Sequence, residues 1–219
     1  MKKYLEVIQK CPLFAQINEE DTMALLGCLG ARVESYPKRE TIFAEGEAAL
    51  QIGILLSGSA QVVRVDYFGN RTLLSEIEPS ELFAESFACA EVAKIPVSIV
   101  ANEPCEVMLI DCVRILHSCG CACGFHQQMI YNLMKDVATK NIQFHQKIEI
   151  TSKRSTREKL LAYLAIQAKR AGSARFEIPF DRQELADYLE VERSGLSAEI
   201  SKLRKEGILH NTKNTFELL

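Results

Sequence analysis

Residues 181–203 read DRQELADYLEVERSGLSAEISKL, and this stretch decides the fold of the C-terminal part of the chain. Its apolar residues recur at the three- and four-residue spacing of helices. They form one core if two short helices meet at a tight turn between Glu190 and Arg193, with the small Ala186 where the helices cross. These apolar residues are Leu185, Leu189, Leu196, Ile200 and Leu203. The stretch therefore predicts a helix-turn-helix.

The second of these helices is expected to expose short or cationic groups near its N-terminal end. Such a face suits the major groove of DNA, because a helix N-terminus favours phosphate, hydroxyls bind phosphate or base edges, and arginine binds guanine. The alternative is a helical hairpin whose polar face contacts water and binds no DNA. The residues expected on this face are Arg193, Ser194, Gly195, Ser197 and Ser201.

The charge of the chain is distributed unevenly around this motif. The 219 residues hold 26 Lys and Arg against 29 Asp and Glu, a formal net charge of −3. Residues 151–219 alone hold 13 Lys and Arg against 10 Asp and Glu, whereas residues 1–150 hold 13 against 19. An asymmetry of this kind indicates one module that faces nucleic acid.

The basic segment has the other parts of a winged helix-turn-helix. Ser155 and Glu158 have the spacing of a capping box ahead of an apolar helix that Gly172 closes. Residues 176–180 predict a short strand before the two helices. Residues 207–209 and 215–218 predict the two strands of a wing.

The segment after Pro37 has the pattern of short strands. Apolar residues alternate with other residues, and glycine and proline separate the runs. Many short strands punctuated in this way indicate a small β-barrel or sandwich. The expected strands fall at 52–56, 62–65, 72–74, 97–101 and 107–110, with a hairpin turn at 66–70.

A long helix is expected from Phe125 to Ile148, where no proline or glycine occurs. A narrow apolar stripe on a long helix usually packs against another helix. The alternative is a helix that packs only on its own domain. The stripe consists of Ile130, Leu133, Val137, Phe144 and Ile148, interrupted by Lys140 and Asn141.

With these elements in order, the sequence resembles the Crp/Fnr family of transcriptional regulators over nearly its whole length. The likeness rests on the helix-turn-helix through residues 206–209 (EGIL) and on residues 11–14 (CPLF), 42–47 (IFAEGE), 53–58 (GILLSG) and 68–71 (FGNR). The resemblance implies an α+β fold of two domains. A cyclic-nucleotide-binding-like β-barrel of the jelly-roll type is expected over 1–123, a dimerisation helix over 124–150, and a winged helix-turn-helix over 151–219.

The resemblance also implies a DNA-binding transcriptional regulator that binds a palindromic operator as a homodimer, with RNA polymerase as a further partner. By motif match, Arg182 and Gln183 approach the phosphate backbone. Ala198 departs from the family pattern, because an arginine commonly occupies that place in relatives, so the operator need not match theirs. The base-reading face holds Arg193, Ser194 and Ser197, and Gly195, Ser201 and Lys202 complete the candidate DNA-binding residues.

The effector site departs from the pattern of cyclic-nucleotide-binding relatives, in which a short helix and an Arg-Ser or Arg-Thr pair hold the cyclic phosphate. Here residues 79–86 read PSELFAES, and Ile95-Pro96-Val97 stands where the arginine pair would be. The cation is absent, and proline removes an N–H donor. We therefore expect an unknown effector that is not a cyclic nucleotide. Glu85, Ser86, Ile95 and Val97 either line an equivalent pocket for a less anionic ligand or belong to a barrel that has lost its ligand.

A competing sensor is suggested by residues 117–126, HSCGCACGFH, which place three thiols and two imidazoles within ten residues. Thiolates and imidazoles bind iron, zinc and iron-sulfur clusters. The spacing is not the usual Cys-x2-Cys of zinc sites, so no cofactor is predicted. Three alternatives stay open: the regulator responds to a small-molecule effector, the cysteines are merely reduced thiols, or they form a metal or redox sensor. The candidate ligands are Cys119, Cys121, Cys123 and His126, with Cys112 close by, whereas Cys11, Cys28, Cys89 and Cys105 are interpreted as incidental.

Other classes of protein are less consistent with the sequence. The segment before His117 contains no histidine, and no Ser-His-Asp or glycine-rich phosphate motif occurs, which argues against the alternative of a small β-barrel enzyme with an appended helical domain. We therefore expect no enzymatic activity. The chain has neither a signal peptide nor an apolar run of about 20 residues, so a cytoplasmic protein without a membrane partner is expected.

Overall fold

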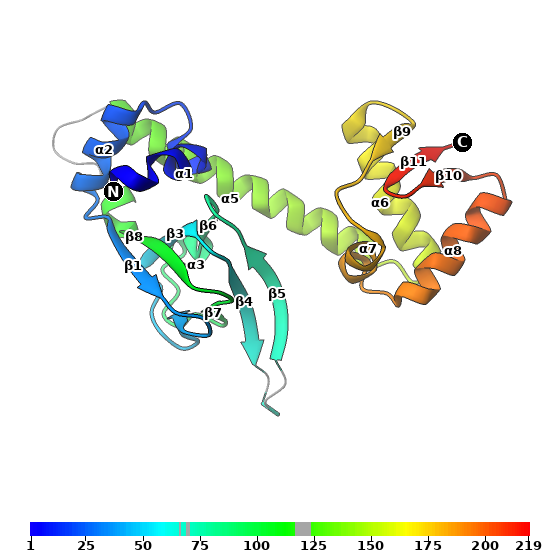
Figure 1. The fold of residues 1–219 in the computed structure, drawn as a ribbon, viewed down its shortest axis with the longest axis horizontal. Coiled ribbons are helices and arrows are strands. Elements are labelled where there is room, and N and C mark those ends of the chain that lie inside the picture. The colour runs from blue at the N-terminus through cyan, green and yellow to red at the C-terminus, as the bar shows by residue number, and fades with distance from the viewer. Residues whose placement is uncertain (66, 69–70, 117–123) are drawn as a thin grey trace. The chain divides into compact units, whose positions relative to one another are not determined.

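The computed structural model describes residues 1–65, 67–68, 71–116 and 124–219, which form two compact units, Met1–Thr139 and Lys140–Leu219. Each unit has a core of its own. The helix α5 (Gly124–Thr151) contributes residues to both units (Figure 1).

The first unit contains the strands that the alternating pattern predicts, arranged as two four-stranded antiparallel sheets (Figure 1). One sheet has the strand order β1-β8-β3-β6 and the other β2-β7-β4-β5. This confirms the expected jelly-roll type of β-domain. The predicted hairpin turn joins β4 and β5, and its residues 66, 69 and 70 lie outside the described residues. The strands are β1 Arg32–Tyr36, β2 Thr41–Phe43, β3 Gln51–Ser57, β4 Ala60–Val65, β5 Arg71–Ile77, β6 Leu82–Phe83, β7 Ser98–Ala101 and β8 Cys105–Asp111.

The strand β3 is buried on both faces. Ile52 and Ile54 pack in a core with the N-terminal helices, whereas Leu55 lies in the core shared with the second sheet. Alternate residues of a strand point to opposite faces, so a nearly continuous apolar run is what a doubly covered strand requires. The helices of this unit before α5 are η1 Lys2–Tyr4, α1 Leu5–Lys10, η2 Pro12–Phe14, α2 Glu19–Cys28, α3 Glu85–Cys89 and α4 Cys112–Leu116.

The first part of α5 is fixed to its own unit. The Asn132 side-chain amide is buried and donates hydrogen bonds to the carbonyl oxygens of Leu13 at 3.0 Å and Ala15 at 2.7 Å. Leu133 is buried in the same core, and Val137 packs against it. Leu133 and Val137, two residues of the predicted stripe, therefore pack in the core of their own unit, as the alternative of a helix packed on its own domain expects.

The second unit has the predicted winged helix-turn-helix. Its three strands form an antiparallel sheet in the order β10-β11-β9, with the wing hairpin formed by β10 and β11 (Figure 1). The five apolar residues of the helix-turn-helix are all buried, and Ala186 is fully buried between them. The elements are α6 Thr156–Ala171, β9 Arg175–Glu177, α7 Arg182–Leu189, α8 Arg193–Lys205, β10 Leu209–Thr212 and β11 Thr215–Leu218.

None of the helices in the described part of the chain has the length and apolar character needed to cross a membrane.

Gly53 tests the packing of the first unit. A Cβ atom at this position would lie 2.2 Å from Cζ of Phe83, on the neighbouring strand. We expect Gly53→Ala to lower the free energy of unfolding by about 1–3 kcal/mol, because the ring has to move within a packed core. Urea unfolding followed by circular dichroism measures this.

The matched control is Gly27→Ala in α2, where an added Cβ would meet no atom within 4 Å. This change should leave stability unchanged or raise it by up to about 1 kcal/mol, since alanine favours helix. Equal unfolding midpoints for the two variants would contradict the described packing.

Candidate nucleic-acid interface

The helix α7 is capped at both ends, and its C-terminal cap forms the turn to α8. At the start, Asp181 accepts a hydrogen bond from the Glu184 amide at 2.8 Å, and Glu184 accepts one from the Asp181 amide at 2.6 Å. At the end, Glu190 takes a left-handed conformation with φ of 54°. The Lys159 ammonium donates to the carbonyl oxygens of Leu189 at 3.2 Å and Glu190 at 3.3 Å. A cation at this end of a helix stabilises its unpaired carbonyls, so Lys159 helps to fix the turn.

The helix α8 presents the predicted face to solvent. Leu196, Ile200 and Leu203 turn into the core. The capping residue Glu192 makes no side-chain hydrogen bond, so it does not occupy the amide groups of the first turn. Free amides at a helix N-terminus attract anions. The predicted residues exposed on α8 are Arg193, Ser194, Gly195, Ser197, Ser201 and Lys202.

Two predicted polar side chains are already hydrogen-bonded within their own helices. The Ser201 hydroxyl donates to the Ser197 carbonyl at 2.9 Å. The Gln183 amide donates to the Asp187 carboxylate at 2.8 Å. Both lie at the surface. Ser201 has to give up this bond before its hydroxyl can donate to DNA, whereas the Gln183 amide has a second N–H to donate.

Arg182 has the most unusual surroundings of the predicted residues. It is half-buried at the start of α7, and its guanidinium carbon lies 5.9 Å from the centre of the Phe216 ring. Burial lowers the pKa of Arg182, and the positive charge of Arg193 lowers it further. Nη1 of Arg182 is buried and has no hydrogen-bond partner among the described residues.

Arg182 and Arg193 thus place two positive charges close together, each on the first residue of a helix. Within the described residues, neither guanidinium forms an ion pair. A buried donor without a partner costs about 1–3 kcal/mol, and helix N-termini favour negative charge. This corner of the unit is therefore suited to an anion such as a phosphate.

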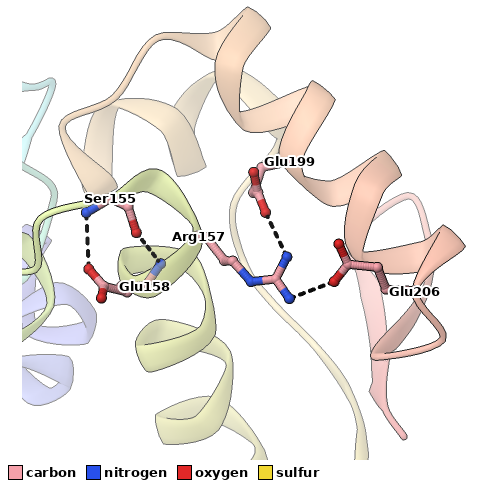
Figure 2. A network of polar contacts seen from close by, with 5 residues as sticks. All are labelled: Ser155, Arg157, Glu158, Glu199 and Glu206. Atoms are coloured by element: carbon pink, nitrogen blue, oxygen red, sulfur yellow. Dashed lines mark hydrogen bonds and ion pairs between the residues drawn. The ribbon is translucent and has the colours of Figure 1, made fainter.

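Arg157 fixes α8 from a distant part of the sequence (Figure 2). Its guanidinium donates to Glu199 on α8 at 3.3 Å and to Glu206, the residue after α8, at 2.6 Å. The hydrogen bond from Arg157 lowers the pKa of Glu206. A cation is unfavourable in the first turn of a helix, so these carboxylates stabilise it there. Figure 2 also shows the capping box of Ser155 and Glu158, which confirms the predicted start of α6.

The four predicted effector residues do not gather around the cavities found in the first unit. Ile95 and Val97 are core residues, Glu85 is buried on α3, and Ser86 is exposed. Two cavities of about 460 and 360 Å³ are lined by other residues. Lys94 is exposed. Ile95 and Val97, two of the predicted effector residues, therefore fill the core with apolar side chains.

The predicted metal ligands are only partly within the described residues. Cys119, Cys121 and Cys123 lie outside them. His126 is buried in α5, and its Nε2 donates to the Ile115 carbonyl at 2.8 Å. Among the residues that the structure describes, no cluster of three or more His, Cys, Asp or Glu has the arrangement of a metal site.

Family models match both units of the chain. The cyclic nucleotide-binding domain matches residues 33–116, and the Crp-like helix-turn-helix domain matches residues 158–219. No curated protein matches the sequence significantly.

Solved structures of several regulators share the fold. The catabolite activator protein of Thermus thermophilus is 22% identical, with 95% of this chain and 93% of that chain covered and a TM-score of 0.50. DNR of Pseudomonas aeruginosa is 20% identical, with 100% of this chain and 95% of that chain covered and a TM-score of 0.51. The c-di-GMP responsive regulator CLP of Xanthomonas campestris is 17% identical, with 90% of this chain and 98% of that chain covered and a TM-score of 0.55.

Proposed function

The chain belongs to the Crp/Fnr family of transcriptional regulators, and we propose that it acts in the cytoplasm by binding a palindromic DNA operator as a homodimer. The observation that carries this proposal is the pair of unneutralised guanidiniums of Arg182 and Arg193 beside the uncapped start of α8. The positive charge of these two guanidiniums favours an anionic backbone. We propose RNA polymerase as a further partner and no enzymatic activity.

In this proposal α8 enters the major groove with its N-terminal half toward the bases. Arg193 donates to a guanine edge, and the hydroxyls of Ser194 and Ser197 bind base edges or phosphate. Arg182 and Gln183 bind the backbone on one side. Ala198 offers only a methyl group, which suits contact with a thymine methyl. Gly195, Ser201 and Lys202 complete the proposed surface.

The proposal of a homodimer rests on the exposed apolar groups of α5. Tyr131 and Met134 are 56% and 63% exposed, and Ala138 is exposed one heptad after Tyr131. Apolar residues at this spacing form the seam of paired helices, and large exposed apolar groups mark an interface. The occupant we propose is α5 of a second copy, with residues 124–150 as the dimerisation helix. Ile142, Phe144 and Ile148 are exposed later on the same helix.

Replacing Arg193 tests the role of α8. We expect Arg193→Ala to weaken binding to a specific duplex by about 10- to 100-fold, the loss of one bidentate contact to a base. Fluorescence anisotropy at fixed salt measures the affinity. The control is Arg175→Ala on β9, an exposed arginine outside the two helices, which should leave the affinity unchanged. Equal affinity of Arg193→Ala and the wild type would refute the assignment.

A charge on α5 tests the homodimer. We expect Met134→Lys to produce a monomer, because two lysine side chains would face each other across an apolar seam. Sedimentation velocity measures the mass. Gln143→Lys, at another exposed position of α5, should remain a dimer. A Met134→Lys protein that remains a dimer would show that the dimer contact does not involve this face of α5. A monomeric wild type would contradict the proposed homodimer.

We propose that the effector is not a cyclic nucleotide, because Ile95 and Val97 fill core positions where relatives have a fixed cation. Calorimetric titration of the full chain with cyclic AMP or cyclic GMP should show no binding at micromolar concentrations. A known cyclic-nucleotide-binding protein titrated in the same buffer is the positive control. A micromolar dissociation constant for either nucleotide would overturn this part of the proposal.

A further inference from the structure

Two cysteines that are distant in the sequence meet in the first unit. Cys89 is the last residue of α3, and Cys112 is the first residue of α4. Their sulfur atoms lie 3.8 Å apart, although 23 residues separate them in the chain. Both are free thiols. The sequence interpretation takes Cys89 as incidental, and spacing along the chain gives no sign of this contact with Cys112.

The pair is accessible to a small oxidant. Cys89 is partly exposed. Cys112 is buried, but it lines the cavity of about 360 Å³ together with Ala88 and Glu91. A cavity of this size admits molecules as small as water or hydrogen peroxide.

The two thiols differ in acidity. The hydrogen bond from the Cys112 thiol lowers the pKa of Cys89, against the opposing effects of burial and of the Glu85 carboxylate. The same hydrogen bond, together with burial, raises the pKa of Cys112. Thiolates react with oxidants, whereas thiols do so slowly. Cys89 is also the more exposed of the two thiols, so it is the one that meets an oxidant first.

We propose that Cys89 and Cys112 are a thiol modification site, which a hydroperoxide converts to a disulfide. The Cys89 thiolate attacks the peroxide oxygen, so that an S–O bond forms and the O–O bond breaks. With hydrogen peroxide the leaving group is hydroxide, which takes up the proton that Cys89 released and becomes water. The Cys112 sulfur then attacks the Cys89 sulfenic acid, an S–S bond forms, and the oxygen leaves as a second water with the Cys112 proton. Overall, two thiols lose two electrons and two protons, and one hydrogen peroxide becomes two waters.

The consequence for the fold is local to the first unit. A disulfide of about 2.05 Å requires the two sulfurs to approach by about 2 Å and then links α3 covalently to α4. α4 is already tied to α5, because the Ile115 carbonyl accepts the hydrogen bond from His126. Oxidation thus acts on the helix that leads into α5. This site goes beyond the proposed DNA binding and does not depend on it.

Peptide mapping of the full chain tests the proposal. Reduced protein is treated with hydrogen peroxide, the remaining thiols are blocked with N-ethylmaleimide, and the chain is cleaved after Glu, Lys and Arg. Cleavage leaves Cys89 in residues 86–91 and Cys112 in residues 107–114, apart from Cys105. We expect these two peptides to be linked after oxidation and separate after dithiothreitol.

Three variants make the outcome specific. Cys89→Ser and Cys112→Ser should lose the linked peptide, whereas Cys105→Ser should keep it. In Cys112→Ser, dimedone should label Cys89 as a sulfenic acid, and in Cys89→Ser it should leave Cys112 unlabelled. The proposal fails if both thiols are still alkylated after peroxide treatment of the wild type. It also fails if Cys89 and Cys112 link mainly to other cysteines, or if dimedone labels Cys112 in Cys89→Ser.

Discussion

The packing of α8 through Leu196, Ile200 and Leu203 is the constraint on which the C-terminal unit depends. Burying each of these side chains contributes about 1.5–3 kcal/mol, and together they fix the rotation of the helix about its axis. Because one stripe faces the core, the short and cationic residues must face solvent. Arg157 and Lys159 on α6 then hold α8 near its two ends, at Glu206 after it and at the turn that precedes it. The proposed DNA-binding surface is thus a consequence of core packing.

The positive charges of two arginines give the C-terminal unit an affinity for anions that core packing alone does not provide. The net charge of the chain is negative, yet Arg182 and Arg193 lie close together without a carboxylate partner in the described part of the chain. Phe216 supports the Arg182 guanidinium from the wing, so the charge is held in place before any ligand arrives. Held donors lose less conformational freedom on binding than mobile ones. The local arrangement of charge therefore says more about the partner than the net charge of the whole protein.

Much of the fold could be predicted from the sequence, because periodicity and capping are local signals. The period of α8 and the pair Ser155 and Glu158 identify their elements directly. Contacts between distant segments have no such signal. Arg157 lies 42 residues from Glu199, and Cys89 lies 23 residues from Cys112, so neither pair could be found by spacing. The apolar stripe of α5 can be recognised in the sequence from its spacing. Periodicity shows that one face of a helix is apolar, but it does not show which segment covers that face.

DNA reading by α8 in a symmetric dimer can be tested by selecting duplexes from a random pool with the 219-residue protein and sequencing them. We expect enrichment of an inverted repeat whose half-sites are centred about 10 base pairs, one helical turn, apart. No enrichment over the input pool by the folded protein, or enrichment of a single half-site without symmetry, would contradict it.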